Sequence, residues 1–467
     1  MKSFESVISH ISPRIKAFAA QVRPMKSRAS VRVRCVVTAA RSVKSKIPMH
    51  VITRMEKPYH FSLALAGALW YWFPTRKMTV IGVTGTKGKT TVVELLHDIL
   101  EAHGMRVASA SSVRFKIDKD EEKNTLGMTM PGRFFLQQFF YRAVKRGCNY
   151  AVVEVTSQGI EQYRHRFINF DMGVFTNISA EHIEAHGGFE PYIRSKLDFF
   201  WRLPKNGIAV INRDDRHASR VDGACKCDKA WYGRELIEYK KYIWPIRNYN
   251  SGSYGIMLDV KGYQIRSQLQ GDVNAENILA AVAAALALRV PIDVIARGVA
   301  QVKEIPGRMQ LIQSVPFRVV VDYAHTPDSL ERVYESLGGK KEDGDSRLLC
   351  VLGATGGGRD TWKRPEFGKI AASFCRDIAI TDEDPFDEDP AKIMEAVYGG
   401  AQEHAGHKMK IIPDRRDAIR HAISVAREGD TVIITGKGSE TFIRVAHGKR
   451  ISWNDAEVAR EELAMNI

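Results

Sequence analysis

The chain has 467 residues, 44% of them hydrophobic, and this length predicts two or three domains with substantial cores. Its formal net charge of +15 is concentrated at one end, because residues 1–50 hold 11 Lys and Arg against the single acid Glu5, which gives 11 − 1 = +10. The remainder carries 15 − 10 = +5, so the composition gives no reason to expect a nucleic-acid partner.

Residues 1–50 are rich in Arg, Ser, Val and Ala and poor in acids. An organelle transit peptide and a disordered basic tail both have this composition, and sequence alone does not separate them. The apolar run Tyr59–Pro74 follows. Its roughly 13 apolar residues fall short of the roughly 20 that span a bilayer. We predict an apolar helical segment over 51–76 that packs on the next domain, with an interfacial anchor as the alternative.

Residues 78–91 read Met-Thr-Val-Ile-Gly-Val-Thr-Gly-Thr-Lys-Gly-Lys-Thr-Thr, a pattern typical of strand, glycine loop and helix. Glycines let backbone N–H groups converge on a phosphate, and the helix N-terminus adds its dipole. Lys89 would reach the β and γ phosphates, and Thr90 would ligate Mg²⁺. Only two residues separate Gly85 from Gly88, whereas the strict P-loop pattern has four residues before its Gly-Lys; the alternative is an ordinary strand-to-helix turn.

Short β-rich runs then alternate with longer helical or irregular stretches, which predicts a parallel sheet wound by helices. A small antiparallel element is expected within 223–270, and a helix over 277–288. The alternation restarts near residue 307, which predicts a second α/β domain. The runs are 150–155, 173–177, 207–212, 317–322, 348–352, 378–380 and 431–434.

Six cysteines include no Cys-x-x-Cys pair, and Cys225-Lys-Cys227 is too tight for an ordinary zinc knuckle. We therefore expect reduced, structural thiols in a cytosol-like compartment.

Candidate metal ligands stand at strand ends, where open α/β sheets bind their ligands. Glu154 closes one strand and His182 follows the next; with Thr90 they suit Mg²⁺ on ATP, although a lone histidine more often packs or hydrogen-bonds. Lys196, taken alone, is a solvated helix lysine.

These residues belong to runs that together resemble the Mur ligases, and most of all the branch that adds the third amino acid of the peptidoglycan stem peptide. The resemblance spans residues 77–467 and implies a central ATP-binding domain over 77–306 and a C-terminal, Rossmann-like domain over 307–467 that binds the acceptor amino acid. The matching runs are 83–91, 154–164, 175–187, 269–277, 306–309, 322–330, 356–365 and 436–440.

The resemblance implies that ATP phosphorylates a substrate carboxylate and that an amine then attacks the acyl phosphate. It gives catalytic roles to Lys89, His182, Lys196 and Arg308, with Lys196 carboxylated on its amine so that it binds a second magnesium. The implied metal ligands are Thr90, Glu154, His182 and Lys196, and the implied ATP-binding residues are Gly85, Thr86, Lys87, Gly88, Lys89, Thr90, Thr91, Asn277, Arg308 and Asp322.

For the substrates, the resemblance implies that Thr129, Ser157 and Arg164 contact a nucleotide-linked muramyl dipeptide, and that Arg359 grips the carboxylate of a free amino acid. Where diaminopimelate-adding relatives carry Asp-Asn-Pro-Arg, this chain reads Glu383-Asp-Pro-Phe386. Loss of the arginine, with acids at Glu383, Asp384 and Glu440, favours lysine over diaminopimelate.

Three departures from the family pattern bear on the donor. Gln158 replaces a usual histidine, Met130 replaces a threonine, and residues 1–76 do not have the pattern of the family's N-terminal, UDP-gripping domain. A folylpolyglutamate- or cyanophycin-type ligase and a non-catalytic nucleotide-binding module are the alternative functions. We expect a cytoplasmic monomer without a transmembrane span, and organelle targeting by the basic N-terminus is the alternative location.

Overall fold

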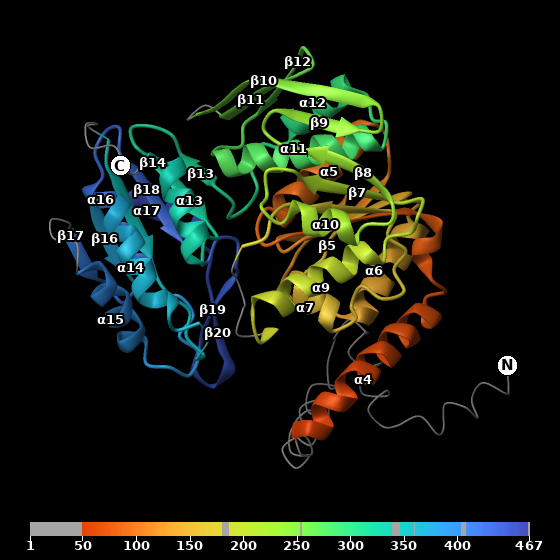
Figure 1. The fold of residues 1–467 in the computed structure, drawn as a ribbon. Coiled ribbons are helices and arrows are strands. Elements are labelled where there is room, and N and C mark those ends of the chain that lie inside the picture. Colours follow the sequence, from red (N-terminus) through yellow and green to blue (C-terminus); the bar gives the residue numbers. More distant parts are fainter. Residues whose placement is uncertain are drawn as a thin grey trace. The chain divides into compact units, whose positions relative to one another are not determined.

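The computed structural model describes residues 49–179, 186–252, 255–338, 346–358, 360–402 and 408–465. The chain separates into two compact units, Met1–Ser62 and Leu63–Ile467, and the second unit contains two large sheets (Figure 1). Two residues singled out from the sequence, His182 and Arg359, lie outside the described residues.

The first sheet has six parallel strands at its centre, in the order β8-β7-β6-β1-β5-β2. Strand β1 reads Thr-Val-Ile-Gly-Val-Thr and is almost fully buried between β5 and β6, because both faces of a parallel sheet are covered. The bounds are β1 Thr79–Thr84, β2 Val107–Ala110, β5 Tyr150–Glu154, β6 Met172–Phe175, β7 Ile208–Asn212 and β8 Asp228–Tyr232.

Antiparallel strands extend both edges of this sheet. Strands β3 (Arg114–Ile117) and β4 (Asp120–Lys123) continue from β2. Beyond β8 the chain forms a meander, which confirms the antiparallel element predicted within 223–270; its strands are β9 Leu236–Tyr239, β10 Tyr242–Gly252, β11 Gly255–Val260 and β12 Tyr263–Ser267.

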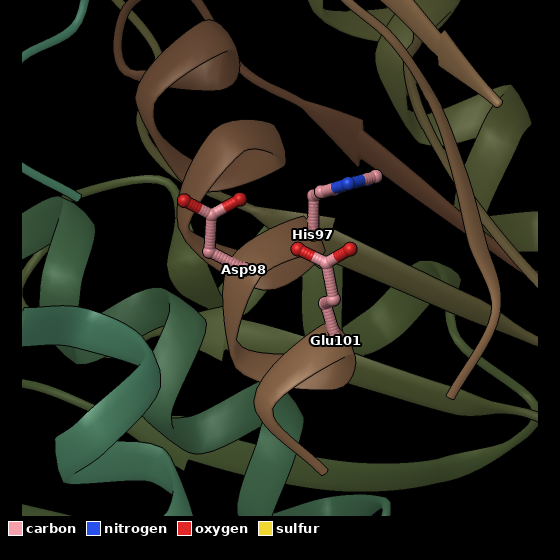
Figure 2. Close-up of side chains that lie close together, drawn as sticks. All are labelled: His97, Asp98 and Glu101. Atoms are coloured by element: carbon pink, nitrogen blue, oxygen red, sulfur yellow. The ribbon is translucent and has the colours of Figure 1, made fainter. Parts of the chain in front are cut away.

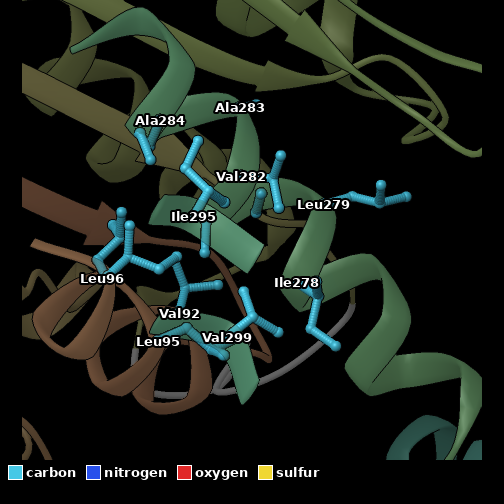
Figure 3. Close-up of a cluster of buried hydrophobic side chains, with 14 of the residues drawn as sticks. Val92, Leu95, Leu96, Ile278, Leu279, Val282, Ala283, Ala284, Ile295 and Val299 are labelled. Atoms are coloured by element: carbon cyan, nitrogen blue, oxygen red, sulfur yellow. The ribbon is translucent and has the colours of Figure 1, made fainter. Parts of the chain in front are cut away.

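Helices α5, α11 and α12 form the larger core of this domain against the sheet (Figure 3). Val92, Leu95 and Leu96 of α5 meet Ile295 and Val299 of α12 in that cluster. The run of buried alanines in α11 leaves room for close backbone packing. The helices are α5 Lys89–Ala102, α6 Arg133–Lys145, α7 Ser157–Glu161, α9 Phe189–Trp201, α10 Ala218–Ala224, α11 Asp272–Ala287 and α12 Ile292–Gln301.

The predicted apolar segment forms helix α4 (Met49–Trp70) and the short helix η1 (Pro74–Lys77). The end of α4 packs on α6: Ala64 and Ala68 are buried, and a Cβ on Gly67 would stand 3.4 Å from the ring of Phe134. Among the described residues, no helix is both long and apolar enough to cross a bilayer.

The second sheet has the order β13-β14-β18-β15-β16-β17, with β13 antiparallel at one edge and the other strands parallel. Its strands are β13 Gln310–Gln313, β14 Arg318–Asp322, β15 Leu348–Leu352, β16 Asp377–Ile380, β17 Lys408–Ile411 and β18 Thr431–Thr435. A hairpin follows, made of β19 (Phe442–Val445), η2 (Ala446–Gly448) and β20 (Lys449–Ser452). The helices are α13 Pro327–Ser336, α14 Lys363–Phe374, α15 Pro390–Ala401, α16 Arg415–Val425 and α17 Asp455–Met465. Both sheets agree with the predicted mostly parallel α/β fold.

The expectation of reduced thiols is wrong for one pair. Cys350 of β15 and Cys375, directly after α14, form a buried disulfide. Helix α14 returns the chain so that the two Cα atoms lie 6.0 Å apart, a proximity that a sequence separation of 25 does not reveal. Cys148, Cys225 and Cys227 are free and buried, as expected.

The close approach of α12 to α5 requires Gly298. A Cβ there would lie 2.5 Å from the Cα of Ile99, against backbone that cannot move aside. We expect Gly298→Ala to lower the free energy of unfolding by about 1–3 kcal/mol, measured by urea denaturation. The matched control is Gly399→Ala, in helix α15, where an added Cβ meets nothing within 4 Å; this change should be neutral or stabilise by up to about 1 kcal/mol. Equal effects of the two changes would contradict this packing argument.

Candidate active site

The C-terminal ends of the central parallel strands gather the polar residues predicted from the sequence. Strand β1 leads into the glycine loop, β2 leads to Ser112, β5 ends at Glu154 and β6 leads to Asn177. Because parallel strands end at one edge of the sheet, these groups are brought together there.

The segment after β6 accepts hydrogen bonds from the glycine loop and fixes its position. Thr86 N–H donates to the carbonyl of Asn177 at 2.8 Å, and Lys87 N–H donates to the Asn177 Oδ1 at 2.9 Å. Gly88 has φ +85°, and a Cβ there would collide with Asn277 Oδ1, so only glycine fits. Lys89 Nζ donates to the carbonyls of Gly85 and Thr86 at 2.9 and 2.7 Å, and helix α5 begins at this residue. The loop is therefore shaped to receive an anion at a helix N-terminus.

Glu154 is the central carboxylate of the site and is only 2% exposed. Its Oε1 accepts hydrogen bonds from Thr90 Oγ1 at 3.0 Å and from the Ser112 N–H and hydroxyl at 2.6 and 2.9 Å. No described residue donates to its buried Oε2. Burial raises the pKa of Glu154, while the nearby Lys89 ammonium acts in the opposite direction. A hydroxyl beside a carboxylate with a spare oxygen fits a hard cation such as Mg²⁺.

Lys196 is not the solvated helix lysine that its position alone suggested. It is 2% exposed, and its Nζ donates to the Gly85 carbonyl at 2.7 Å and lies 4.8 Å from the centre of the Tyr192 ring. Tyr192 in turn hydrogen-bonds Thr86 at 2.8 Å. Helix α9 therefore places a lysine against the glycine loop.

The second domain contributes to the same cavity. Arg308 Nη2 lies 3.5 Å from Thr90 Oγ1, and its guanidinium stacks 4.5 Å from the Tyr323 ring. Asp322 closes β14 and accepts the N–H groups of Met309 and Ala324, both at 2.7 Å; burial raises its pKa. The cavity measures about 580 Å³ and is lined from both domains, including Gly85, Thr86, Lys87, Gly88, Lys89, Thr90, Thr91, Glu154, Lys196, Asn277, Arg308 and Asp322.

The residues expected to contact the donor line one side of this cavity. Thr129, Ser157 and Arg164 all reach it, as do Gln158 and Met130, the two positions that depart from the family pattern. Thr129 Oγ1 lies 3.3 Å from Ser112 Oγ, within hydrogen-bond distance, which links these residues to the Glu154 network. Arg164 Nη1 donates to the Met130 carbonyl.

The three acids expected near the acceptor lie apart from the cavity lining, after the ends of β16 and β18. Two of them are paired with cations. Lys437, fully buried, donates to Asp384 Oδ1 at 2.7 Å and to Glu440, and Arg444 of β19 bonds Asp384 and lies 3.3 Å from Glu440 Oε1. We call Asp384, Lys437, Glu440 and Arg444 the charged cluster.

Glu383 differs from its neighbours because it is buried with little compensation. Its Oε1 accepts from Thr355 Oγ1 at 2.9 Å, and no described residue donates to its Oε2. Burial raises its pKa to about 7, against the opposing effect of Arg415.

Sequence reasoning missed Ser112, Lys437 and Arg444. Ser112 follows β2, and the strand-end rule that found Glu154 would have found it had β2 been predicted. Lys437 stands inside the matched 436–440 run, so its motif was a signal. Arg444 carries no sequence signal, because only the hairpin brings it to Asp384.

A second cluster of possible metal ligands lies on α5, where His97, Asp98 and Glu101 gather (Figure 2). Its carboxylates already have cations: Lys119 lies 2.5 Å from Glu101 and Lys116 lies 3.2 Å from Asp98. Burial, helped by Lys116, lowers the pKa of His97 to about 3. We assign no metal to this cluster, because lysines already neutralise its acids.

Comparison with known proteins agrees with this geometry. Family models match residues 83–285, as the Mur ligase middle domain, and residues 307–438, as the Mur ligase glutamate ligase domain. The chain is 34% identical over 406 residues to the UDP-N-acetylmuramoyl-L-alanyl-D-glutamate–2,6-diaminopimelate ligase of Solibacter usitatus, covering 86% of this chain and 80% of that protein. It is 33% identical over 432 residues to the enzyme of the same name from Aquifex aeolicus, covering 91% and 85%.

The fold is also similar to those of solved ligase structures. A structure of a UDP-N-acetylmuramoyl-L-alanyl-D-glutamate–2,6-diaminopimelate ligase has a TM-score of 0.57 at 28% identity, covering 83% of this chain and 79% of that one. Folylpolyglutamate synthase of Mycobacterium tuberculosis, complexed with ADP and AMPPCP, has a TM-score of 0.63 over 83% and 94%, but at 19% identity it shows the fold alone. With two family models matched in order and relatives above 30% identity over most of its length, the chain belongs to the Mur ligase family and is an ATP-dependent ligase.

Proposed function

We propose that this ligase adds the third amino acid to UDP-N-acetylmuramoyl-L-Ala-D-Glu, through an acyl phosphate, in peptidoglycan synthesis. One observation carries the proposal: a single cavity joins the glycine loop and Glu154 of the first domain to Arg308 and Asp322 of the second. Such a cavity would hold a nucleotide and a carboxylate donor in line, and this positioning is the main requirement of phosphoryl transfer.

The proposed role of each cavity residue follows from its charge and polarity. Lys89 and Arg308 place positive charge where a transferring phosphoryl group gathers negative charge. Thr90 and Glu154 would hold Mg²⁺, which when bound neutralises phosphate oxygens. Asn277 lies against the loop and Asp322 faces it from the other domain, where they would contact the adenosine part of ATP.

Lys196 is the second group that we assign to the phosphate end. We propose that its amine, once neutral, takes up CO₂ and releases a proton, and that the resulting carbamate, with His182, would hold a second magnesium. The position of Lys196 supports this role, because its Nζ is buried against the glycine loop, where the phosphates of ATP are expected. An ammonium at this position would repel a metal ion, whereas a carbamate would attract one.

The charged cluster bears on the acceptor. The expectation of lysine rested on uncompensated acids, but Lys437 and Arg444 balance Asp384 and Glu440. Arg444 stacks on Phe442 at 4.9 Å and lies 5.8 Å from the ring of Phe386, the residue that replaces the loop arginine. We therefore propose diaminopimelate, whose distal carboxylate would pair with Arg444, and keep lysine as the alternative acceptor. Arg359 would grip the other carboxylate.

The folylpolyglutamate-type reading has weaker support, because that likeness concerns the fold, whereas the relatives above 30% identity are named for diaminopimelate addition. Phosphate release from ATP with UDP-N-acetylmuramoyl-L-Ala-D-Glu, measured with diaminopimelate, lysine or ornithine, tests the proposal. Release that depends on both substrates is expected. Absence of release with every acceptor would overturn it, and release with a folate substrate would favour the alternative.

Glu154→Gln removes one charge and nearly no volume. We expect kcat to fall by about 10²- to 10³-fold and the required Mg²⁺ concentration to rise, because the carboxylate is the proposed metal ligand. Glu101→Gln, on α5 and in the cluster to which we assign no metal, is the control and should leave both quantities unchanged. An equal change in the two variants would refute the assignment.

Arg444→Gln should raise the KM for diaminopimelate by about 10- to 100-fold and change that for lysine much less, because of these two acceptors only diaminopimelate has a distal carboxylate for the guanidinium to bind. Arg450→Gln is a matched control, since Arg450 stacks on the same Phe442 ring at 4.3 Å but lies outside the charged cluster. Melting temperatures of both variants would report whether the fold is kept. Equal losses for the two acceptors would argue against the proposed pairing.

Glu383 predicts a pH-dependent stability. Its pKa is about 7 in the folded chain against 4.5 for the free side chain, so the folded state binds the extra proton between these values. The free energy of unfolding should therefore fall as pH rises from 4.5 through 7, by up to about 3 kcal/mol from this residue. Urea unfolding at pH 5 and pH 8 should show this loss in the wild type and not in Glu383→Gln. Glu366→Gln, at a side chain that is 42% exposed, should behave as the wild type.

A further inference from the structure

Three tryptophans on the first domain are largely exposed: Trp70 at 69%, Trp72 at 84% and Trp201 at 52%. Trp70 and Trp72 precede β1, and Trp201 ends the helix before β7. All three therefore belong to the N-terminal edge of the parallel strands, opposite the edge that forms the active-site cavity. Their exposure is not explained by the ligase reaction.

Phe167 connects the region around Trp70 and Trp72 to the region around Trp201. The ring of Phe73, next to Trp72, meets Phe167 edge-on at 6.4 Å, and Asn169 N–H donates to Thr75 Oγ1 at 3.1 Å. Phe167 and Trp201 line a second cavity of about 450 Å³. The tryptophans thus belong to one continuous region, which we call the aromatic–basic face and define by Leu69, Trp70, Trp72, Arg76, Trp201 and Lys226.

Cations accompany the rings of this face. The Arg76 guanidinium lies 4.6 Å from the Phe73 ring, Lys226 Nζ lies 4.6 Å from the Trp201 ring, and Lys145 Nζ lies 5.6 Å from the ring of Tyr141, beside Tyr71. The segments 63–77, 133–145 and 162–170 contain no acidic residue. Acids on neighbouring elements already have partners: Asp171 accepts the Val80 N–H, Asp198 pairs with Arg202, and Glu122 lies 3.4 Å from Arg142 of α6. Asp222 and Asp228, on either side of Lys226 in the sequence, pair with Lys229 and Lys240.

The backbone holds Trp72 outward at a cost. Trp72 and Phe73 have φ values of 57° and 48°, in the left-handed region that bulky residues rarely adopt. Such a conformation persists where surrounding contacts determine it, and it marks functional positions more often than chance. Here it turns a large ring toward solvent just before two cations, Arg76 and Lys77.

We propose that the aromatic–basic face binds the surface of an anionic lipid bilayer. Tryptophan is favoured at the boundary between acyl chains and headgroups, and neighbouring lysine and arginine bind anionic headgroups. The positive charge continues into the chain upstream, where residues 1–50 carry +10. Docking by this edge leaves the opposite, catalytic edge open to substrates.

Flotation of the full-length protein with vesicles tests the proposal. We expect binding to vesicles of phosphatidylglycerol and phosphatidylcholine and little binding to phosphatidylcholine alone. Trp70→Ser/Trp72→Ser should weaken binding by at least about tenfold, because the inserted apolar area is lost. Tyr242→Ser/Ile243→Ser is the matched control: both side chains are 55% exposed, but they lie on the β9–β10 hairpin, and this variant should bind as the wild type does.

Fluorescence quenching and sedimentation velocity distinguish lipid binding by this face from binding by the basic tail and from self-association. Brominated lipids should quench tryptophan fluorescence in the wild type and less in Arg76→Gln/Lys77→Gln, even if the serine variant is unstable. Flotation that is unchanged in the serine variant would show that the basic tail alone holds the lipid, and would overturn the proposal. So would absence of flotation, or a dimer in sedimentation velocity that the serine variant abolishes, because a second copy would then cover the face.

Discussion

The buried carboxylate of Glu154 is the group around which the candidate active site is organised. An ionised carboxylate at 2% exposure is unfavourable unless hydrogen bonds and nearby cations compensate it. Thr90 and Ser112 supply the hydrogen bonds, and Lys89 and Arg308 supply the positive charge. The compensating residues come from the glycine loop, from the end of a second strand and from the other domain, so the requirement of one carboxylate brings three segments of the chain together.

The arrangement of the parallel sheet separates the two surfaces of the first domain. Strand ends with glycines and small polar residues form one edge, where backbone N–H groups and the dipole of α5 favour anions. The strand beginnings form the other edge, with tryptophans, tyrosines and cations. The candidate active-site cavity and the proposed lipid-binding face therefore do not compete for the same residues.

Charge balance, rather than the count of acids, governs the proposed acceptor region. Three acids in the sequence suggested an anionic pocket, yet Lys437 and Arg444 neutralise two of them, and the high pKa of Glu383 leaves the third partly protonated near neutral pH. Phe386 stands where related enzymes have a loop arginine. The positive charge lost by this replacement can be supplied by Arg444 from the neighbouring hairpin. Substitutions read singly from a motif therefore do not decide specificity, because charges from neighbouring elements contribute to the same region.

The sequence by itself determined most of the parallel strands, the glycine loop, the two α/β domains and the family, because hydrophobic periodicity and turn residues are local signals and the motifs occur in a fixed order. Most of the site residues that it predicted line the cavity. The tertiary structure decided what depends on contacts between distant segments: the Cys350–Cys375 disulfide, the burial of Lys196 against Gly85, and the pairing of Arg444 with Asp384. Burial and charge compensation are properties of the surroundings in space, and no spacing along the chain records them.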